Sequence, residues 1–280
     1  MGKAEQPGLA GVRAKLDRAH IQLDELDLQM EAFGDREPYG TSDAQPNADR
    51  RQWVWYLKFR PQMPLTWGVM LGEIVHDLRS ALDHAIFQLT LNYVHREISG
   101  TGFPISDDPT SWDKRGGKRQ ADNPLAYDWR CAMYQLRGVG PGVVEYIKRL
   151  QPYSTQDPKS SPLLALHALW NQDKHRLIHA WGLELDQGRS EIRYEGPPRP
   201  HKVLFETGVL HDGDKAASIT FDGPVDEGHL SGRFATKLAF ENPVDPSPAP
   251  GDSLMRLHDA TAAVVYSLLA RIGHQDETLA

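Results

Sequence analysis

Hydrophobic side chains recur at alternating intervals of three and four residues over the first part of the chain. This heptad pattern predicts one long amphipathic helix, which Gly34 ends. The apolar seam consists of Leu9, Val12, Leu16, Ala19, Leu23, Leu26, Met30 and Phe33. Such a seam can pack inside its own chain or against a second copy, and the sequence leaves both arrangements open.

Helical spacing of apolar residues returns in several later segments. The longest of these runs from Leu65 to about Arg96. Pro141 and Pro162 stand where helices are expected to begin, with Ser161 as the cap of the second. The expected helices cover residues 65–96, 141–150, 163–176 and 252–273, and a short one lies within 127–136.

Apolar pairs two residues apart, separated by turn residues, mark five short strands in the last third of the chain. These pairs are Leu183/Leu185, Ile192/Tyr194, Val203/Phe205, Ile219/Phe221 and Leu238/Phe240. An aromatic and β-branched run, Trp53–Phe59, predicts an earlier strand. The expected fold class is therefore α+β, a helical bundle with an antiparallel sheet inserted before the last helix.

We expect one interleaved domain over residues 1–280. Its mainly helical part covers 1–176 and includes the strand near 51–60. The sheet part covers 177–241, and the C-terminal helix, 252–273, returns to the bundle.

Composition narrows the class of protein. Apolar residues make up 40% of the 280 residues, which is enough for a substantial core. Lys plus Arg number 31 against 38 Asp plus Glu, so the net charge is 31 − 38 = −7 and any site for a polyanion must be local. Cys131 is the single cysteine, and no apolar run approaches the ~18 residues that span a bilayer. We therefore expect a cytoplasmic protein with no membrane partner.

The predicted helix over residues 65–96 carries the most suggestive chemistry. Arg79 and Asp83 lie four residues apart and can pair, while His76, Ser80 and His84 follow one another at the same interval. An arginine that clamps phosphate and a histidine near its titration point are what metal-independent RNA cleavage needs. In that hypothesis Arg79 stabilises charge on phosphorus and His84 moves the proton, without metal or cofactor.

The segment Arg79–His84 resembles the Arg-x4–6-His motif of the HEPN superfamily, although Ser80 departs from the Asn, Asp or His that usually follows the arginine. Arg13 and His20, with six residues between them, also satisfy this pattern on the first helix, a match that we interpret as chance. The resemblance implies a helical bundle, metal-independent ribonuclease activity and a homodimer in which two motifs meet across the interface.

A wider resemblance covers about half of the chain. It rests on four segments that look like those of a family of uncharacterised bacterial proteins: His76–His84, Phe103–Ile105, Gln151–Tyr153 and Asp173–Arg176. Asp77 stands where that family commonly has Asn. This resemblance implies the positions of the motifs and names no reaction.

Further candidates surround this motif. Asp173 is a candidate to brace Arg79, and His175 and Arg176 to extend a phosphate site, although a charged helix end explains the same residues. His167, Asn171 and His175 share a helix face, which favours hydrogen bonding in the core. The candidate RNA contacts on the basic loop are Lys114, Arg115, Lys118 and Arg119.

The leading hypothesis is a HEPN-like metal-independent endoribonuclease or RNA-binding protein that acts as a homodimer, with Arg79 and His84 catalytic. The supporting residues are Ser80, Asp83, His76, Asp173, His175 and Arg176. A non-enzymatic protein-association module, sensitive along Leu16, Leu23 and Leu26, is the first alternative. A metal-dependent enzyme is the second, because Glu73 and His76 have the Glu-x-x-His spacing of metal sites in helical bundles.

Overall fold

The computed structural model describes residues 7–34, 39–59, 64–115, 127–128, 130–175, 181–240 and 253–275. The chain is α+β, about 49% helical and 18% strand, as predicted. It divides into two compact units, each assembled from separate stretches. We call residues 1–24, 69–178 and 254–280 the helical unit, and residues 25–68 and 179–253 the sheet unit. The expectation of one interleaved domain stays a prediction.

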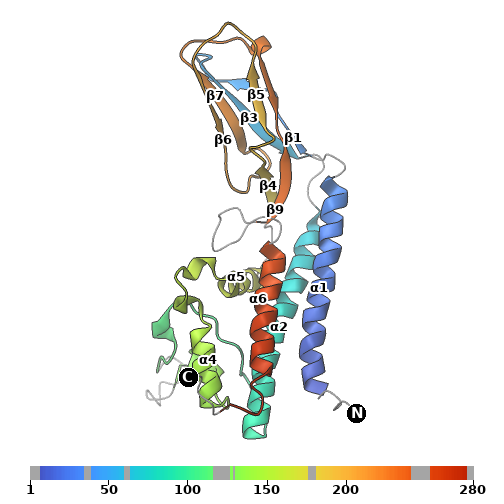
Figure 1. The fold of residues 1–280 in the computed structure, drawn as a ribbon, viewed down its shortest axis with the longest axis vertical. Helices are drawn as coiled ribbons and strands as arrows, with labels where there is room; N and C mark the ends of the chain where they lie inside the picture. Colours follow the sequence, from blue (N-terminus) through green and yellow to red (C-terminus); the bar gives the residue numbers. More distant parts are fainter. Residues whose placement is uncertain are drawn as a thin grey trace. The chain divides into compact units, whose positions relative to one another are not determined.

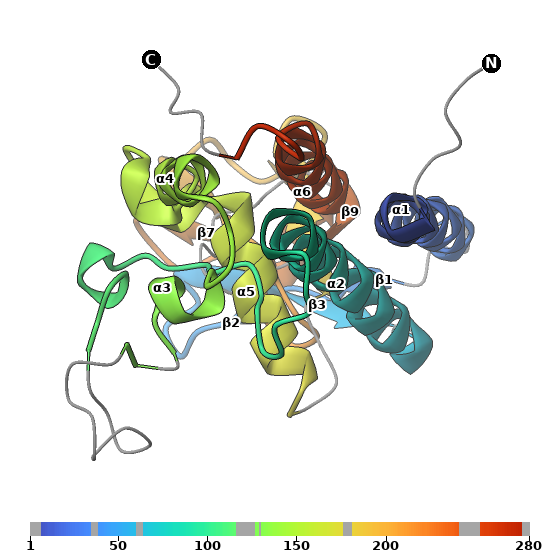
Figure 2. The same cartoon turned by 90° about the horizontal axis from the view of Figure 1, so that it is seen from below.

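Six α-helices lie within the described residues. They are α1 (Pro7–Gly34), α2 (Leu65–Val94), α3 (Ala132–Gln135), α4 (Pro141–Arg149), α5 (Pro162–Asp173) and α6 (Ser253–Leu269). In the helical unit, α2 lies among α1, α5 and α6 (Figure 2). Ala81, Leu82, Ile86 and Thr90 are all fully buried, and at 100° per residue they span about 180° around α2, a range that includes Arg79. This enclosure explains how a charged residue on α2 comes to be buried as well.

The apolar seam of α1 packs within its own chain. Leu16 and Leu23 are buried, and the Leu16 carbonyl lies 3.3 Å from Nε2 of His258 on α6. Farther along α1, the ring of Phe33 packs edge-on against Trp67 at 5.2 Å between centroids. Of the two arrangements that the heptad pattern allows, the structure therefore has the intramolecular one.

In the sheet unit, antiparallel strands pair across a long separation in sequence. The five-stranded sheet has the order β1-β3-β7-β6, with β2 also on β3, and two further ladders join β4 to β9 and β5 to β8. The strands are β1 (Tyr39–Thr41), β2 (Gln45–Pro46), β3 (Gln52–Phe59), β4 (Trp181–Leu185), β5 (Glu191–Tyr194), β6 (His201–Phe205), β7 (Lys215–Phe221), β8 (Leu230–Arg233) and β9 (Thr236–Phe240). Figure 1 shows β3, β7 and β6 side by side.

The alternating pattern places the core of this unit. Trp53 and Trp55 on β3 are buried with Ile219 and Phe221 on β7, because every second side chain of a strand faces the same way. The strand predicted within the helical part therefore belongs to the sheet, since β3 pairs with β7. All five predicted strand pairs lie in strands of the structure.

Several boundaries differ from the prediction. The helix expected within 127–136 covers only Ala132–Gln135, because Cys131 is extended and its N–H bonds to the Asp128 carbonyl. The helix expected to reach Arg176 ends at Asp173. Cys131 itself is buried and forms no disulfide. Within the described ranges, none of the helices has the length and apolar character that a bilayer crossing demands.

The α1 seam gives a matched test of this packing. Leu23 is 2% exposed and Ile21, two residues earlier, is 64% exposed. We expect Leu23→Ala to lower the free energy of unfolding by about 2–5 kcal/mol and Ile21→Ala to change it by less than about 0.5 kcal/mol. Urea unfolding followed by circular dichroism measures both. A loss on Leu23→Ala as small as that on Ile21→Ala would contradict the packing of Leu23 in the core of its own chain.

Candidate functional site

Arg79 is a buried arginine in the middle of α2, only 6% exposed. Its Nη2 lies 2.9 Å from Oδ1 of Asp83, and its Nε lies 3.3 Å from Oδ2 of the same carboxylate. The predicted pair between these residues is therefore confirmed, and it has a forked geometry in which two N–H groups face two oxygens. Such paired contact offsets the cost of burying the guanidinium.

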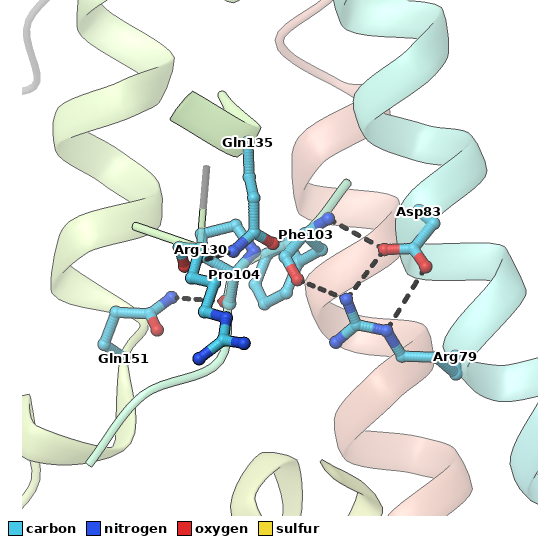
Figure 3. A network of polar contacts seen from close by, with 7 residues as sticks. All are labelled: Arg79, Asp83, Phe103, Pro104, Arg130, Gln135 and Gln151. Atoms are coloured by element: carbon cyan, nitrogen blue, oxygen red, sulfur yellow. Dashed lines mark hydrogen bonds and ion pairs between the residues drawn. The ribbon is translucent and has the colours of Figure 1, made fainter. Parts of the chain in front are cut away.

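The pair also holds the backbone of a loop (Figure 3). Arg79 Nη2 donates to the Phe103 carbonyl at 2.6 Å, and the Phe103 N–H donates to Asp83 Oδ1 at 2.8 Å. Phe103 lies outside regular secondary structure, so its polar backbone groups need such partners when they are buried. Together, Arg79 and Asp83 fix Phe103 through both its donor and its acceptor.

A buried glutamine forms hydrogen bonds with the same loop, at Pro104 and Ser106. Gln151, which follows α4 and is fully buried, donates from Nε2 to the Pro104 carbonyl at 3.0 Å and accepts from the Ser106 N–H at 3.0 Å. The loop is thus held by side chains from α2 and from the end of α4 (Figure 3). Three of the four segments that carry the wider resemblance therefore meet around Phe103 and Pro104.

A cavity of about 800 Å³ adjoins this loop in the helical unit. Three arginines line it, namely Arg79, Arg130 and Arg137, and none of the described residues that line it is an aspartate or glutamate. Arg137 is engaged with backbone carbonyls, including that of Gly100, and its guanidinium lies over the Tyr134 ring at 3.8 Å. The described lining therefore carries three arginines and no carboxylate, in a protein whose net charge is −7.

Helix α5 contributes an aromatic and polar wall to the cavity. The guanidinium carbon of Arg79 lies over the Trp170 ring, 5.0 Å from the ring centroid. The Lys174 ammonium lies over the same ring. His167 lies one turn earlier, and its Nε2 is 3.0 Å from the amide nitrogen of Asn171. The two residues on this face of α5 are hydrogen-bonded as predicted, but the bond is exposed and does not lie in the core, because Asn171 is exposed.

Two buried donors at the cavity are unusual. Arg79 Nη1 and His167 Nδ1 have no hydrogen-bond partner among the described residues. Burial lowers the pKa of His167 to about 4, and the charges of Arg79 and Lys174 act in the same direction. The imidazole is therefore neutral at pH 7. Because the Asn171 amide nitrogen can only donate to Nε2, the ring proton belongs on Nδ1.

The structure does not bring Arg79 and His84 together in one chain. Five residues on a helix correspond to about 140° of rotation, and the two side chains leave α2 in different directions. His84 faces α1, where a Cβ on Gly11 would lie 3.3 Å from its Cε1, and it lies 3.3 Å from Gln88. Its pKa is lowered by burial and then by the charge of Lys15.

Another group of candidates lines a second hollow of about 570 Å³ in the helical unit. His76 is exposed there, and Asp173 lies against Gly72, since a Cβ at Gly72 would be 2.3 Å from Oδ1 of Asp173. Asp173 was predicted to brace Arg79, but it lines this second hollow and not the cavity of Arg79. Ser80 is half-buried and lines neither hollow.

The remaining cationic candidates are dispersed. His175 is exposed beyond the end of α5, and Lys114 and Arg115 are exposed, with the Arg115 guanidinium 4.2 Å from the centroid of the Tyr127 ring. Arg176, Lys118 and Arg119 lie outside the described residues. Lys114 is tied to the segment that carries Arg130, because its carbonyl accepts from the Asp128 N–H at 2.8 Å.

The Glu-x-x-His pattern of the metal hypothesis lies on the side of α2 that faces α1. Glu73 accepts a hydrogen bond from Gln22 at 2.6 Å and lies 3.7 Å from Arg18. Within the ranges that the structure describes, no group of three or more His, Cys, Asp or Glu side chains is arranged to hold a metal ion.

The sequence pattern did not single out two of the three arginines of the cavity, Arg130 and Arg137, or its tryptophan, Trp170. Arg130 and Arg137 lie around a short helix with no strong pattern, and their approach to Arg79 depends on the fold of the 99–106 loop. Trp170 was detectable only through its neighbours, His167 and Asn171. No family model, curated protein or solved structure matches this chain.

Two ion pairs, Arg79–Asp83 and Glu145–Arg149, each join residues four apart on a helix, but only the first also holds the loop. We therefore expect the loss of the first pair to lower the free energy of unfolding more than the loss of the second. Asp83→Ala would leave Arg79 buried and unpaired, so we expect the free energy of unfolding to fall by about 3 kcal/mol. Glu145→Ala breaks an exposed pair with Arg149, at 3.8 Å, and should cost less than about 1 kcal/mol. Urea unfolding of the two variants makes the comparison, and equal losses would refute the structural role of Asp83.

Proposed function

We propose that this protein binds RNA, and that the cavity of Arg79 is where a phosphate and a base are held. The observation that carries the proposal is a buried guanidinium nitrogen without a partner, at a cavity lined by arginines and by no carboxylate of the described residues. Such a cavity attracts anions although the whole chain is acidic.

Charge and ring chemistry support a nucleotide unit over a simple anion. Arg130 and Arg137 add positive charge to Arg79, which suits a phosphate backbone. Tyr134 and Trp170 contribute half-buried aromatic rings to the same lining. Bases of single-stranded RNA stack on aromatic rings, and each such contact contributes about 1–3 kcal/mol.

The choice of RNA among phosphorylated ligands comes from the resemblance of Arg79–His84 to the HEPN motif. Cleavage that uses both residues would need two copies of the chain, because the two side chains diverge from α2 in one copy. The binding role needs only Arg79 and its neighbours within one chain, and for that reason we propose binding as the function.

Binding of a labelled single-stranded RNA, followed by fluorescence anisotropy at several salt concentrations, tests the proposal. Arg130→Gln removes a cationic side chain of the cavity, so the affinity should fall and the salt dependence should become shallower by about 0.7 in log–log slope. Arg149→Gln is the matched control, since Arg149 is exposed on α4 and outside the cavity. No binding by the wild type, or equal effects of the two variants, would contradict the proposal.

The same RNA incubated in EDTA and separated on a denaturing gel distinguishes binding from cleavage. Intact RNA is the result expected of a binding protein. Cleavage that is lost in both Arg79→Lys and His84→Gln would replace our proposal with the HEPN-like nuclease and would require a homodimer.

A further inference from the structure

Arg79 on α2 and His167 on α5 line the same cavity. Each lies beside Trp170: the Arg79 guanidinium is 5.0 Å from the indole ring, and the His167 and Trp170 ring centroids are 6.4 Å apart. The charge of Arg79 is also felt by His167. The two side chains therefore border one cavity beside the same indole ring.

Each of the two side chains has one nitrogen without a hydrogen-bond partner among the described residues. The guanidinium of Arg79 has three nitrogens. Asp83 and the Phe103 carbonyl accept hydrogen bonds from Nε and Nη2, whereas Nη1 has no partner among the described residues. Nδ1 of His167 also has none, because Asn171 is bonded at the opposite side of the ring. A buried donor without an acceptor costs about 1–3 kcal/mol, so two at one cavity call for an occupant that accepts.

We propose that Arg79 Nη1 and His167 Nδ1 form a subsite for one tetrahedral oxyanion, which is the phosphate of the bound nucleotide unit. An oxyanion accepts from both donors at once and balances the positive charge that Arg79, Arg130 and Arg137 give the cavity. The identity of the ligand as RNA rests on the proposed function, whereas the subsite itself rests on these two donors.

The subsite predicts a direction of pH dependence. The groups that act on His167 are Arg79 on α2 and Lys174 on α5, which favour the neutral ring, and Asp83 on α2 and Asp107 in the loop, which favour the charged ring. A bound anion adds to the second group, so His167 holds a proton more tightly when the anion is bound. Affinity for an anion that does not titrate should therefore rise as the pH falls from 7.5 to 5.5.

Sulfate is a suitable probe, because it is tetrahedral and keeps its charge over this pH range. Its binding can be followed by the ¹⁵N resonances of the His167 imidazole and by titration calorimetry, with chloride added to hold the ionic strength constant. We expect saturable binding to the wild type, a shift of the His167 resonances, and tighter binding at pH 5.5 than at pH 7.5.

His167→Phe keeps a ring and removes the donor, so sulfate should bind about tenfold more weakly and without the pH dependence. His95→Asn is the matched control, because His95 is exposed and outside the cavity, and its positive φ of 55° is one that Asn accepts. Arg79→Lys would also lose the hold on Phe103 and can unfold the site, so His167→Phe carries the test.

Two outcomes separate this inference from the proposed function. Sulfate binding that depends on His167, in a protein that binds no RNA, would support the subsite and overturn RNA as the ligand. RNA binding that depends on Arg130, with sulfate affecting wild type and His167→Phe alike, would overturn the subsite and leave the RNA proposal standing.

Discussion

The helical unit depends on how one buried charge is accommodated. Arg79 lies on the same side of α2 as the fully buried Val75, Leu82 and Ile86, where an unpaired guanidinium would cost several kcal/mol. Asp83, one turn later, supplies the counter-charge, and the two side chains then bond the backbone of Phe103. A loop that makes no ladder hydrogen bonds is thereby fixed against α2, and the wall of the cavity is built from this contact.

The nitrogens of Arg79 differ in their hydrogen bonding. Its Nε and Nη2 bond Asp83 and the Phe103 carbonyl, whereas its Nη1 has no partner among the described residues, as is also true of His167 Nδ1. This division is the reason why we propose a binding role for an arginine that also stabilises the fold. It also separates Arg79 from His84, which faces α1 and belongs to the packing of the helices.

Much of the fold was predictable, because the buried face of a helix or strand requires apolar residues at regular intervals in the sequence. The α1 seam, the Trp53–Phe59 strand and the apolar pairs of the sheet each showed their period directly. The pairing of β3 with β7 was not visible, since no local pattern reports a partner more than 150 residues away. In the site, the Arg79–Asp83 pair follows from helical spacing alone. The bond to Phe103, the direction of His84 and the approach of Arg130 depend on tertiary contacts, and helical spacing says nothing about them.

Arg79 is held by Asp83 and Phe103, and we propose that its remaining nitrogen binds an anion. Crystals grown or soaked in selenate, a heavier analogue of sulfate, test this most directly through the anomalous scattering of selenium. We expect an anomalous peak in the cavity, with selenate oxygens at hydrogen-bond distance from both Arg79 Nη1 and His167 Nδ1. A cavity that holds only water at saturating selenate would contradict it.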